Sequence, residues 1–199
     1  MRTRLTTERR RAQLLAIGAE LFARRPYGQV SIDEVAQAAG ISCGLLYHYF
    51  PSKQAFVAAV VEEEGAKLLG ASTPDPADAP LRQIVAGLDV YIKQAESFPD
   101  GYRMAHYAVP TSGDLNSAHQ TRITVQRDRI LASLATATSL DGETEIAVTS
   151  WLAFVETAIL DWVDNPTISR EQLRDLCIRT LCAAVGLEAD ARAIKTVAR

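Results

Sequence analysis

A run of hydrogen-bonding side chains between residues 31 and 53 is the part of this 199-residue sequence best equipped for chemistry. Hydroxyl, thiol, imidazole, phenol and ammonium groups follow one another there, and only Asp33 and Glu34 carry carboxylates. Groups of this kind exchange hydrogen bonds with phosphate oxygens and base edges. Ser31, at a predicted helix start, would offer its hydroxyl and the free helical N–H groups to a phosphate. The chemistry indicated is contact with a nucleic acid.

The sequence lacks the residue patterns that catalysis and metal binding require. Its histidines, at positions 48, 106 and 119, form no HxxxH or HxxE pair. No Gly-x-Ser-x-Gly elbow, P-loop or Rossmann glycine pattern occurs. Cys43, Cys177 and Cys182 form neither a CxxC motif nor a disulfide framework, which is typical of a reducing compartment. We therefore expect no enzyme activity, no cofactor, no metal and a cytoplasmic location.

Two short helices joined by a tight turn must position the side chains of residues 31–53. Ser31 and Glu34 form a capping box that predicts the start of the first helix. Gly40 follows its last turn, where a left-handed residue ends a helix at little cost. Ser42 caps the second helix, which Pro51 ends. This layout is the helix-turn-helix, whose second helix enters the major groove of DNA.

The residues Gly40-Ile41-Ser42-x-Gly44-x-Leu46-Tyr47-x-Tyr49-Phe50-x-Ser52-Lys53 resemble the DNA-binding signature of the TetR family of transcriptional regulators. The resemblance covers about the first quarter of the chain. It implies that the positions after the turn face DNA and that Tyr47 and Lys53 hold the DNA backbone. The DNA-contacting residues expected on these grounds are Ser31, Ser42, Cys43, Gly44, Leu45, Tyr47, His48, Tyr49 and Lys53.

The sequence departs from the family pattern at two of these positions. Cys43 stands where a lysine or another polar residue is frequent, and Leu45 where a small hydroxyl residue is frequent. Neither side chain can make a bidentate bond to guanine or adenine. We expect specificity to depend on thymine methyl groups, on Tyr47 and Tyr49, and on DNA shape. The alternative is that Leu45 packs inward and Cys43 is inert.

The charge distribution also separates the amino-terminal part from the rest. Residues 1–53 contain eight Lys and Arg against four acidic residues, a net charge of +4, whereas the whole chain has −3. The remainder therefore carries −7. A basic head on an acidic body suits DNA on one side and a different partner on the other.

Helical periodicity continues to the end of the chain, so we predict an all-α fold of about nine helices. Outside the helix-turn-helix, the expected helices are 8–24, 52–69, 81–96, 102–108, 116–137, 143–164 and one that begins at the capping box of Ser169 and Gln172. We expect a DNA-binding domain at 1–53 and a helical effector-binding and dimerisation domain at 54–199. The sequence shows no apolar stretch of about 18 residues, so we expect no membrane span.

The helical body offers polar side chains among apolar neighbours, which is the composition of a small-molecule pocket. The candidates are Tyr91, Arg103, His106, Tyr107, Glu156 and Thr157. Glu156 stands out because it follows Val155 on a largely apolar helix, and a buried acid usually has a partner. It would receive a polar or cationic ligand group, or else pair with a neighbouring arginine or lie at a dimer edge.

The last two helices each carry more apolar surface than one bundle needs. In the family that the sequence resembles, these helices pair with their copies as a four-helix dimer interface. The residues expected there are Trp151, Val155, Ile159, Trp162, Leu173, Leu176 and Thr180. Dimerisation also has a physical motive, because two heads about 34 Å apart can contact the halves of a palindrome.

Together these observations predict a ligand-responsive repressor. A homodimer would bind a double-stranded, palindromic operator and be released by a small-molecule effector. Within the same class an activator is the alternative. A helical small-molecule carrier or protein-interaction module without DNA binding is the alternative from a different class, and the unusual Cys43 and Leu45 favour it.

Overall fold

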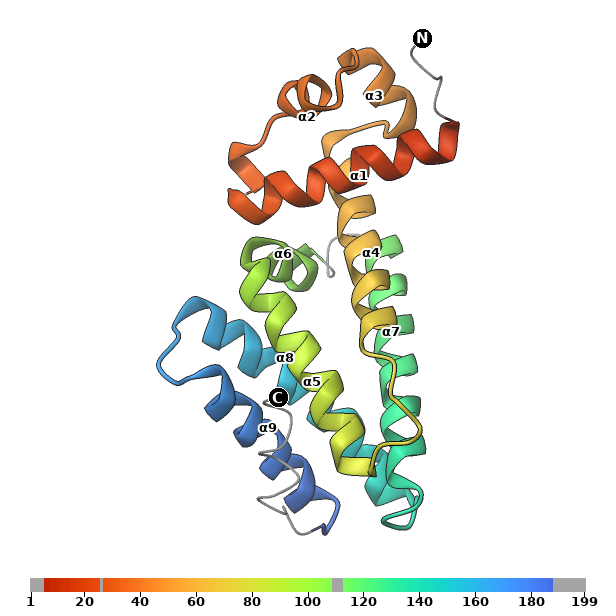
Figure 1. The fold of residues 1–199 in the computed structure, drawn as a ribbon, viewed down its shortest axis with the longest axis vertical. Helices are drawn as coiled ribbons and strands as arrows, with labels where there is room; N and C mark the ends of the chain where they lie inside the picture. The colour runs from red at the N-terminus through yellow and green to blue at the C-terminus, as the bar shows by residue number, and fades with distance from the viewer. Residues whose placement is uncertain (1–5, 26, 109–112, 188–199) are drawn as a thin grey trace. The chain divides into compact units, whose positions relative to one another are not determined.

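The computed structural model describes residues 6–25, 27–108 and 113–187. Every regular element in these ranges is helical, which confirms the all-α prediction (Figure 1). The α-helices are α1 (Thr7–Arg24), α2 (Ile32–Ala39), α3 (Cys43–Tyr49), α4 (Lys53–Ala71), α5 (Pro80–Ser97), α6 (Pro99–Ala108), α7 (Gly113–Leu134), α8 (Gly142–Asp164) and α9 (Arg170–Ala184), with a 3-10 turn at Tyr27–Gln29.

The chain forms two compact units. The first comprises Met1–Lys67 and Ser97–Asn116, and the second comprises Leu68–Glu96 and Ser117–Arg199. Helix α4 therefore contributes residues to both units, and α6 belongs to the first. This grouping by contacts is a different kind of division from the predicted domain boundary after Lys53, which stays a prediction.

The first unit is built around aromatic side chains from α1, α3 and α4. Phe22, Phe50 and Phe56 are buried, and the Phe50 and Phe56 rings meet edge to face with centroids 5.1 Å apart. Gly18 of α1 lets the chain approach Phe56 closely, since an added Cβ would lie 2.6 Å from the ring. Leu46 of α3 is completely buried in the same core. One face of α3 is thereby fixed inward.

The predicted caps of the helix-turn-helix are confirmed. The Ser31 hydroxyl accepts a hydrogen bond from the Glu34 N–H at 3.2 Å, and the Ser42 hydroxyl accepts one from the Leu45 N–H at 3.2 Å. Gly40 ends α2 with φ 65°, in the left-handed region that glycine adopts without steric cost. These local interactions set where α3 begins.

Two predicted boundaries need correction. The helix expected at 102–108 starts three residues earlier, because α6 begins at Pro99. Proline suits the first helical position because its missing N–H would have no helical acceptor there. Helix α7 runs over Gly113–Leu134 in place of 116–137, and the Ala137 N–H already turns back to the Leu134 carbonyl at 2.8 Å.

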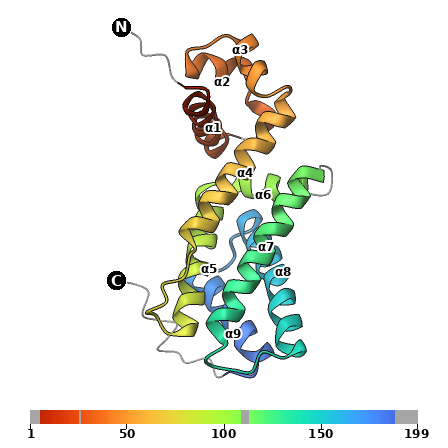
Figure 2. The same ribbon diagram turned by 90° about the vertical axis from the view of Figure 1, so that its right-hand side faces the viewer.

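Helices α8 and α9 pack against each other in the second unit, as Figures 1 and 2 both show. The Trp151 indole N–H donates to the Cys177 carbonyl at 2.7 Å and joins the two helices. Around this bond, Ile159, Ile178 and Leu181 are fully buried. One face of the apolar helix α8 is therefore buried in the core of the second unit.

An apolar stretch of the length needed for a membrane span is present after all, whereas the expectation of no membrane span stays a prediction. Among the described residues, α8 is long and apolar enough to span a membrane by length and composition. Core helices of soluble proteins pass the same test, and α8 packs on α9 here. Only 28% of its most apolar window is buried, so much of its surface is not explained by contacts within one chain.

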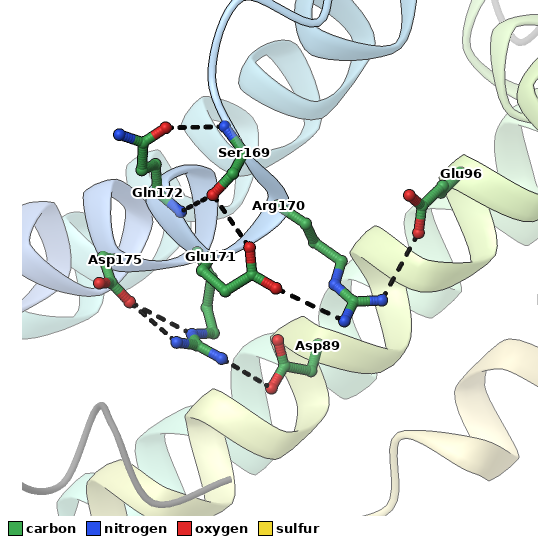
Figure 3. A network of polar contacts seen from close by, with 8 residues as sticks. Asp89, Glu96, Ser169, Arg170, Glu171, Gln172 and Asp175 are labelled. Atoms are coloured by element: carbon green, nitrogen blue, oxygen red, sulfur yellow. Dashed lines mark hydrogen bonds and ion pairs between the residues drawn. The ribbon is translucent and has the colours of Figure 1, made fainter. Parts of the chain in front are cut away.

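A polar network joins the start of α9 to α5 (Figure 3). Ser169 and Gln172 form the predicted capping box, with both reciprocal hydrogen bonds present. Arg174, whose side chain is 11% exposed, bonds Asp89 of α5 at 3.4 Å and Asp175 at 3.1 Å. These contacts fix the rotation of α9 about its axis against α5.

Candidate functional site

Helix α3 presents large side chains to solvent on the face opposite its buried one. Leu45 is 40% exposed and Tyr47 is 46% exposed, whereas Leu46 is fully buried. Leu45 therefore does not pack inward. Leu45 and Tyr47 flank the buried Leu46 on the helix, and exposed apolar groups of this size gain free energy when another surface covers them. The nearby His48 is exposed too, and its ring meets the edge of Tyr49 at a centroid distance of 5.8 Å.

Cys43, at the first position of α3, is held by a neighbour that the sequence did not predict. Its Sγ donates to Asp33 Oδ1 of α2 at 2.8 Å. This hydrogen bond, with the negative charge of Asp33, raises the pKa of the thiol above its usual range. Cys43 is therefore kept as a neutral thiol. No periodic signal links residues ten apart across a turn, so the contact could be found only in the structure.

The other predicted DNA-contacting residues lie at helix starts. Ser31 and Ser42 are exposed N-cap residues, Gly44 is exposed in the first turn of α3, and Lys53 is the partly buried first residue of α4. An added Cβ at Gly44 would meet no atom within 4 Å. The backbone at Gly44 is thus open to a close approach from outside. Their contact with DNA stays a prediction.

A cavity of about 60 Å³ lies within the second unit, between α5, α7, α8 and the segment after α4. Predicted residues Tyr91 and Glu156 are in its wall. The full lining is Ser72, Pro74, Gln83, Ile84, Gly87, Leu88, Tyr91, Ile123, Gln126, Arg129, Ile130, Ser133, Trp151, Leu152, Val155 and Glu156. Most of this wall is apolar, with polar groups from α7 among them.

The residues of α7 in this wall were missed by sequence analysis. Gln126, Ile130 and Ser133 recur at intervals of four and three, which is the spacing of one helical face. This spacing is visible in the sequence, but Gln126 and Ser133 are polar and gave no reason to expect that this face of the helix points inward. Gln126 is buried because its amide donates to Ser72 Oγ at 2.8 Å and to Tyr91 Oη at 3.2 Å.

Glu156 is the carboxyl group of the cavity. Its Oε1 lies 3.5 Å from His119 Nε2. Burial raises the pKa of Glu156 to about 7, which the positive charge of Arg122 only partly opposes. Burial lowers the pKa of His119, and Arg122 adds to that effect. Although the distance would suit an ion pair, both pKa shifts favour the neutral forms. Glu156 is mostly protonated below about pH 7 and ionises above it, so just below that pH the contact is a polar one between uncharged groups.

The remaining predicted ligand residues are not in this wall. Arg103 pairs with Asp100 within α6, at 2.8 Å, and the His106 ring lies 4.4 Å from that of Tyr102. Thr157 is exposed and donates to the Ala153 carbonyl of its own helix. The side chain of Tyr107 lies outside the described part of the structure. Any ligand contact by these residues would require a site other than this cavity.

Four residues predicted at the dimer interface are buried inside a single chain. These are Trp151, Val155, Ile159 and Leu173, which the packing of α8 on α9 covers. A second chain could not reach them in this conformation, so their assignment to an interface does not fit the structure. Leu176 is 38% exposed, and Trp162 and Thr180 are partly exposed. The sequence grouped these residues into one apolar stripe on each of the two helices, and helical periodicity alone does not tell whether such a stripe faces the core or a second chain.

The amino-acid sequence is similar to those of known transcriptional regulators. The model of bacterial regulatory proteins of the tetR family matches residues 14–60. The transcriptional regulator EthR of Mycolicibacterium smegmatis is 28% identical over 152 residues, or 66% of this chain and 70% of that protein. The transcriptional repressor KstR2 of Rhodococcus jostii is 48% identical over 48 residues, 24% of each chain.

A solved structure agrees over most of the length. The tetR-family transcriptional regulator from Streptomyces coelicolor has a TM-score of 0.81 and 27% sequence identity, covering 90% of this chain and 82% of that one. The relatives found are transcriptional regulators and not enzymes. The helix-turn-helix, the cavity-bearing helical body and these relatives agree, and the chain belongs to the TetR family of transcriptional regulators.

Proposed function

We propose that this regulator is a repressor that binds a palindromic operator as a homodimer and leaves it when a small molecule fills the cavity of α5, α7 and α8. The observation that carries the proposal is the outward face of α3, where Leu45 and Tyr47 are exposed while Leu46 anchors the helix. That face lies inside the segment that the family model matches.

On DNA, α3 would lie in the major groove. Leu45 is suited to a thymine methyl group, because an apolar side chain can recognise thymine there without hydrogen bonds. The Tyr47 hydroxyl and the Lys53 ammonium would contact phosphates, and Ser31 would add a third such contact at the start of α2. Cys43 remains protonated through Asp33 and would bring no charge to the groove.

Dimerisation is supported by the apolar surface that α8 and α9 leave uncovered. Ile146 of α8 is 70% exposed and Leu176 of α9 is 38% exposed. Such side chains are costly in water and gain free energy when a second copy covers them. Sedimentation should give a dimer at low micromolar concentration, and Ile146→Asp should shift it toward monomer. A wild-type protein that sediments as a monomer would contradict this part of the proposal.

The remaining features follow from this role. A domain boundary after Lys53 would separate the operator-binding helices from the effector-binding body. A cytoplasmic location would place the protein with its operator.

DNA binding is tested by fluorescence anisotropy with a duplex taken from the DNA beside the protein's own gene. Affinity should fall steeply with salt, since each phosphate contact releases counterions. Tyr47→Ala and Lys53→Ala should each weaken binding about tenfold and lower the salt dependence. Leu140→Ala, at a 44% exposed position far along the sequence in the second unit, is the control and should change nothing. Binding that does not depend on salt would favour a carrier without DNA recognition.

A further inference from the structure

Two cavity residues of α7 also hold the carboxyl-terminal end of α4. Arg129 Nη1 donates to the Leu69 carbonyl at 2.7 Å, and its Nη2 donates to Thr73 Oγ1 at 3.2 Å. One turn away, Gln126 donates to Ser72 Oγ at 2.8 Å. The last carbonyls of a helix have no helical partner. The Leu69 carbonyl is capped by Arg129 together with the Ser72 hydroxyl, which also donates to it at 3.2 Å. The wall of the cavity and the end of α4 are therefore one hydrogen-bonded assembly.

Arg129 brings a positive charge to this hydrogen-bonded assembly. Its two acceptors, the Leu69 carbonyl and the Thr73 hydroxyl, are uncharged. Within the described ranges, Arg129 forms no ion pair with a carboxylate. A guanidinium stays charged at every physiological pH, and its donors match the two oxygens of a carboxylate. An anion that reached the cavity would be a stronger partner than either present acceptor.

The rest of the wall fits an apolar body attached to such an anion. Ile84, Leu88, Ile130 and Leu152 surround the space. Glu156 is the acid that could repel an anion, but burial keeps it largely protonated below about pH 7. The cavity thus combines a cation on α7 with apolar side chains from three helices.

We propose that the effector is a small amphipathic carboxylate and that Arg129 is the residue that senses it. The carboxylate takes the guanidinium from the Leu69 carbonyl and the Thr73 hydroxyl, and the end of α4 loses its charged donor and keeps only the Ser72 hydroxyl at Leu69. Helix α4 begins at Lys53, directly after α3 in the chain. This inference rests on the proposed function, since it supplies the effector class for the repressor.

Ligand preference is measured by calorimetry on the full chain without DNA, using octanoate, 1-octanol and octylamine as probes of equal length. Octanoate should bind at least about tenfold more tightly than octanol, as expected for a charge-assisted pair. Arg129→Gln should abolish that preference, and Arg129→Lys should keep part of it. Arg127→Gln is the matched control, because Arg127 is on the same helix, is 40% exposed and pairs with Asp128. Equal binding of octanol, or tighter binding of octylamine, would overturn the proposal.

The coupling to α4 is measured as the ratio of operator dissociation constants with and without saturating octanoate. Effector couplings of this type are about 5- to 150-fold. We expect a ratio in that range for the wild type and for Arg127→Gln, and a ratio near one for Arg129→Gln. If the wild type binds no operator, the proposed function fails while the calorimetry still decides the ligand class. A full ratio in Arg129→Gln would refute the sensing role.

Discussion

Adding one methyl group to α3, at Gly44, should leave the stability of the fold equal or higher and lower the affinity for DNA. Gly44 lies in the first turn of α3 and has no positive φ, so its backbone is already helical. An alanine Cβ would meet no protein atom within 4 Å. Gly44→Ala therefore gains helix propensity, up to about 1 kcal/mol, and loses no contact. We expect the free energy of unfolding in urea to stay the same or rise by that amount.

The effect on DNA should have the opposite sign. If the α3 backbone approaches the groove floor at Gly44, the added methyl group meets the DNA and cannot be accommodated without a shift. Overpacking of one methyl group costs about 1–3 kcal/mol, which is a loss of about 5- to 150-fold in affinity. Fluorescence anisotropy with the operator duplex measures this directly.

Gly142→Ala is the matched control for Gly44→Ala. Gly142 is also in the first turn of a helix, α8, and an added Cβ there likewise meets no atom within 4 Å. It lies in the second unit, so the DNA affinity of this variant should be unchanged. If Gly44→Ala binds the operator as tightly as the wild type, the face of α3 that carries Gly44 is not against DNA and the assignment of the groove contacts is refuted.

Three further changes test the packing and electrostatics. Gly18→Ala should destabilise the fold by about 1–2 kcal/mol in urea unfolding, because its Cβ would lie 2.6 Å from the buried Phe56 ring and overpacking exceeds the gain in propensity. Because burial raises the pKa of Glu156 to about 7, its protonated form stabilises the folded state at low pH and this contribution is lost as pH rises through about 7. Glu156→Gln should therefore be more stable than the wild type at pH 8, by at most about 3 kcal/mol, and thermal melts at pH 6, 7 and 8 should show that the gain grows with pH. Arg174→Ala should cost about 2–3 kcal/mol in urea unfolding, since it leaves the half-buried Asp89 without its partner; a loss below 0.5 kcal/mol would mean that the pair does not hold α9.

The sequence was most informative where a structure is decided by neighbours along the chain. The caps at Ser31, Ser42 and Ser169 and the left-handed Gly40 involve residues four or fewer positions apart, and all are present. Each of these interactions closes within one helical turn, so its energy depends little on the rest of the fold.

Predictions failed where the outcome depends on which face of a helix is covered. Trp151 and Leu173 were placed at a dimer surface, yet the contact between α8 and α9 buries both. An apolar residue favours any apolar surface, so composition does not distinguish the partner helix from a second chain. The cavity donors Gln126 and Arg129 were missed for the converse reason, because polar residues on a helix are usually solvated and their acceptors lie 35 to 60 residues away.

Helix α8 contributes residues to the cavity wall, to the contact with α9 and to the exposed apolar surface proposed for the dimer. Trp151 and Val155 lie in the cavity wall, Ile159 lies in the contact with α9, and Ile146 is exposed for a second chain. A packed helix moves as a unit, since interiors are too dense for one side chain to shift alone. A ligand that displaces the cavity face of α8 must therefore displace its exposed face as well. By linkage, effector binding and dimer stability then affect each other equally, so effector should change the dimer dissociation constant even when no DNA is present.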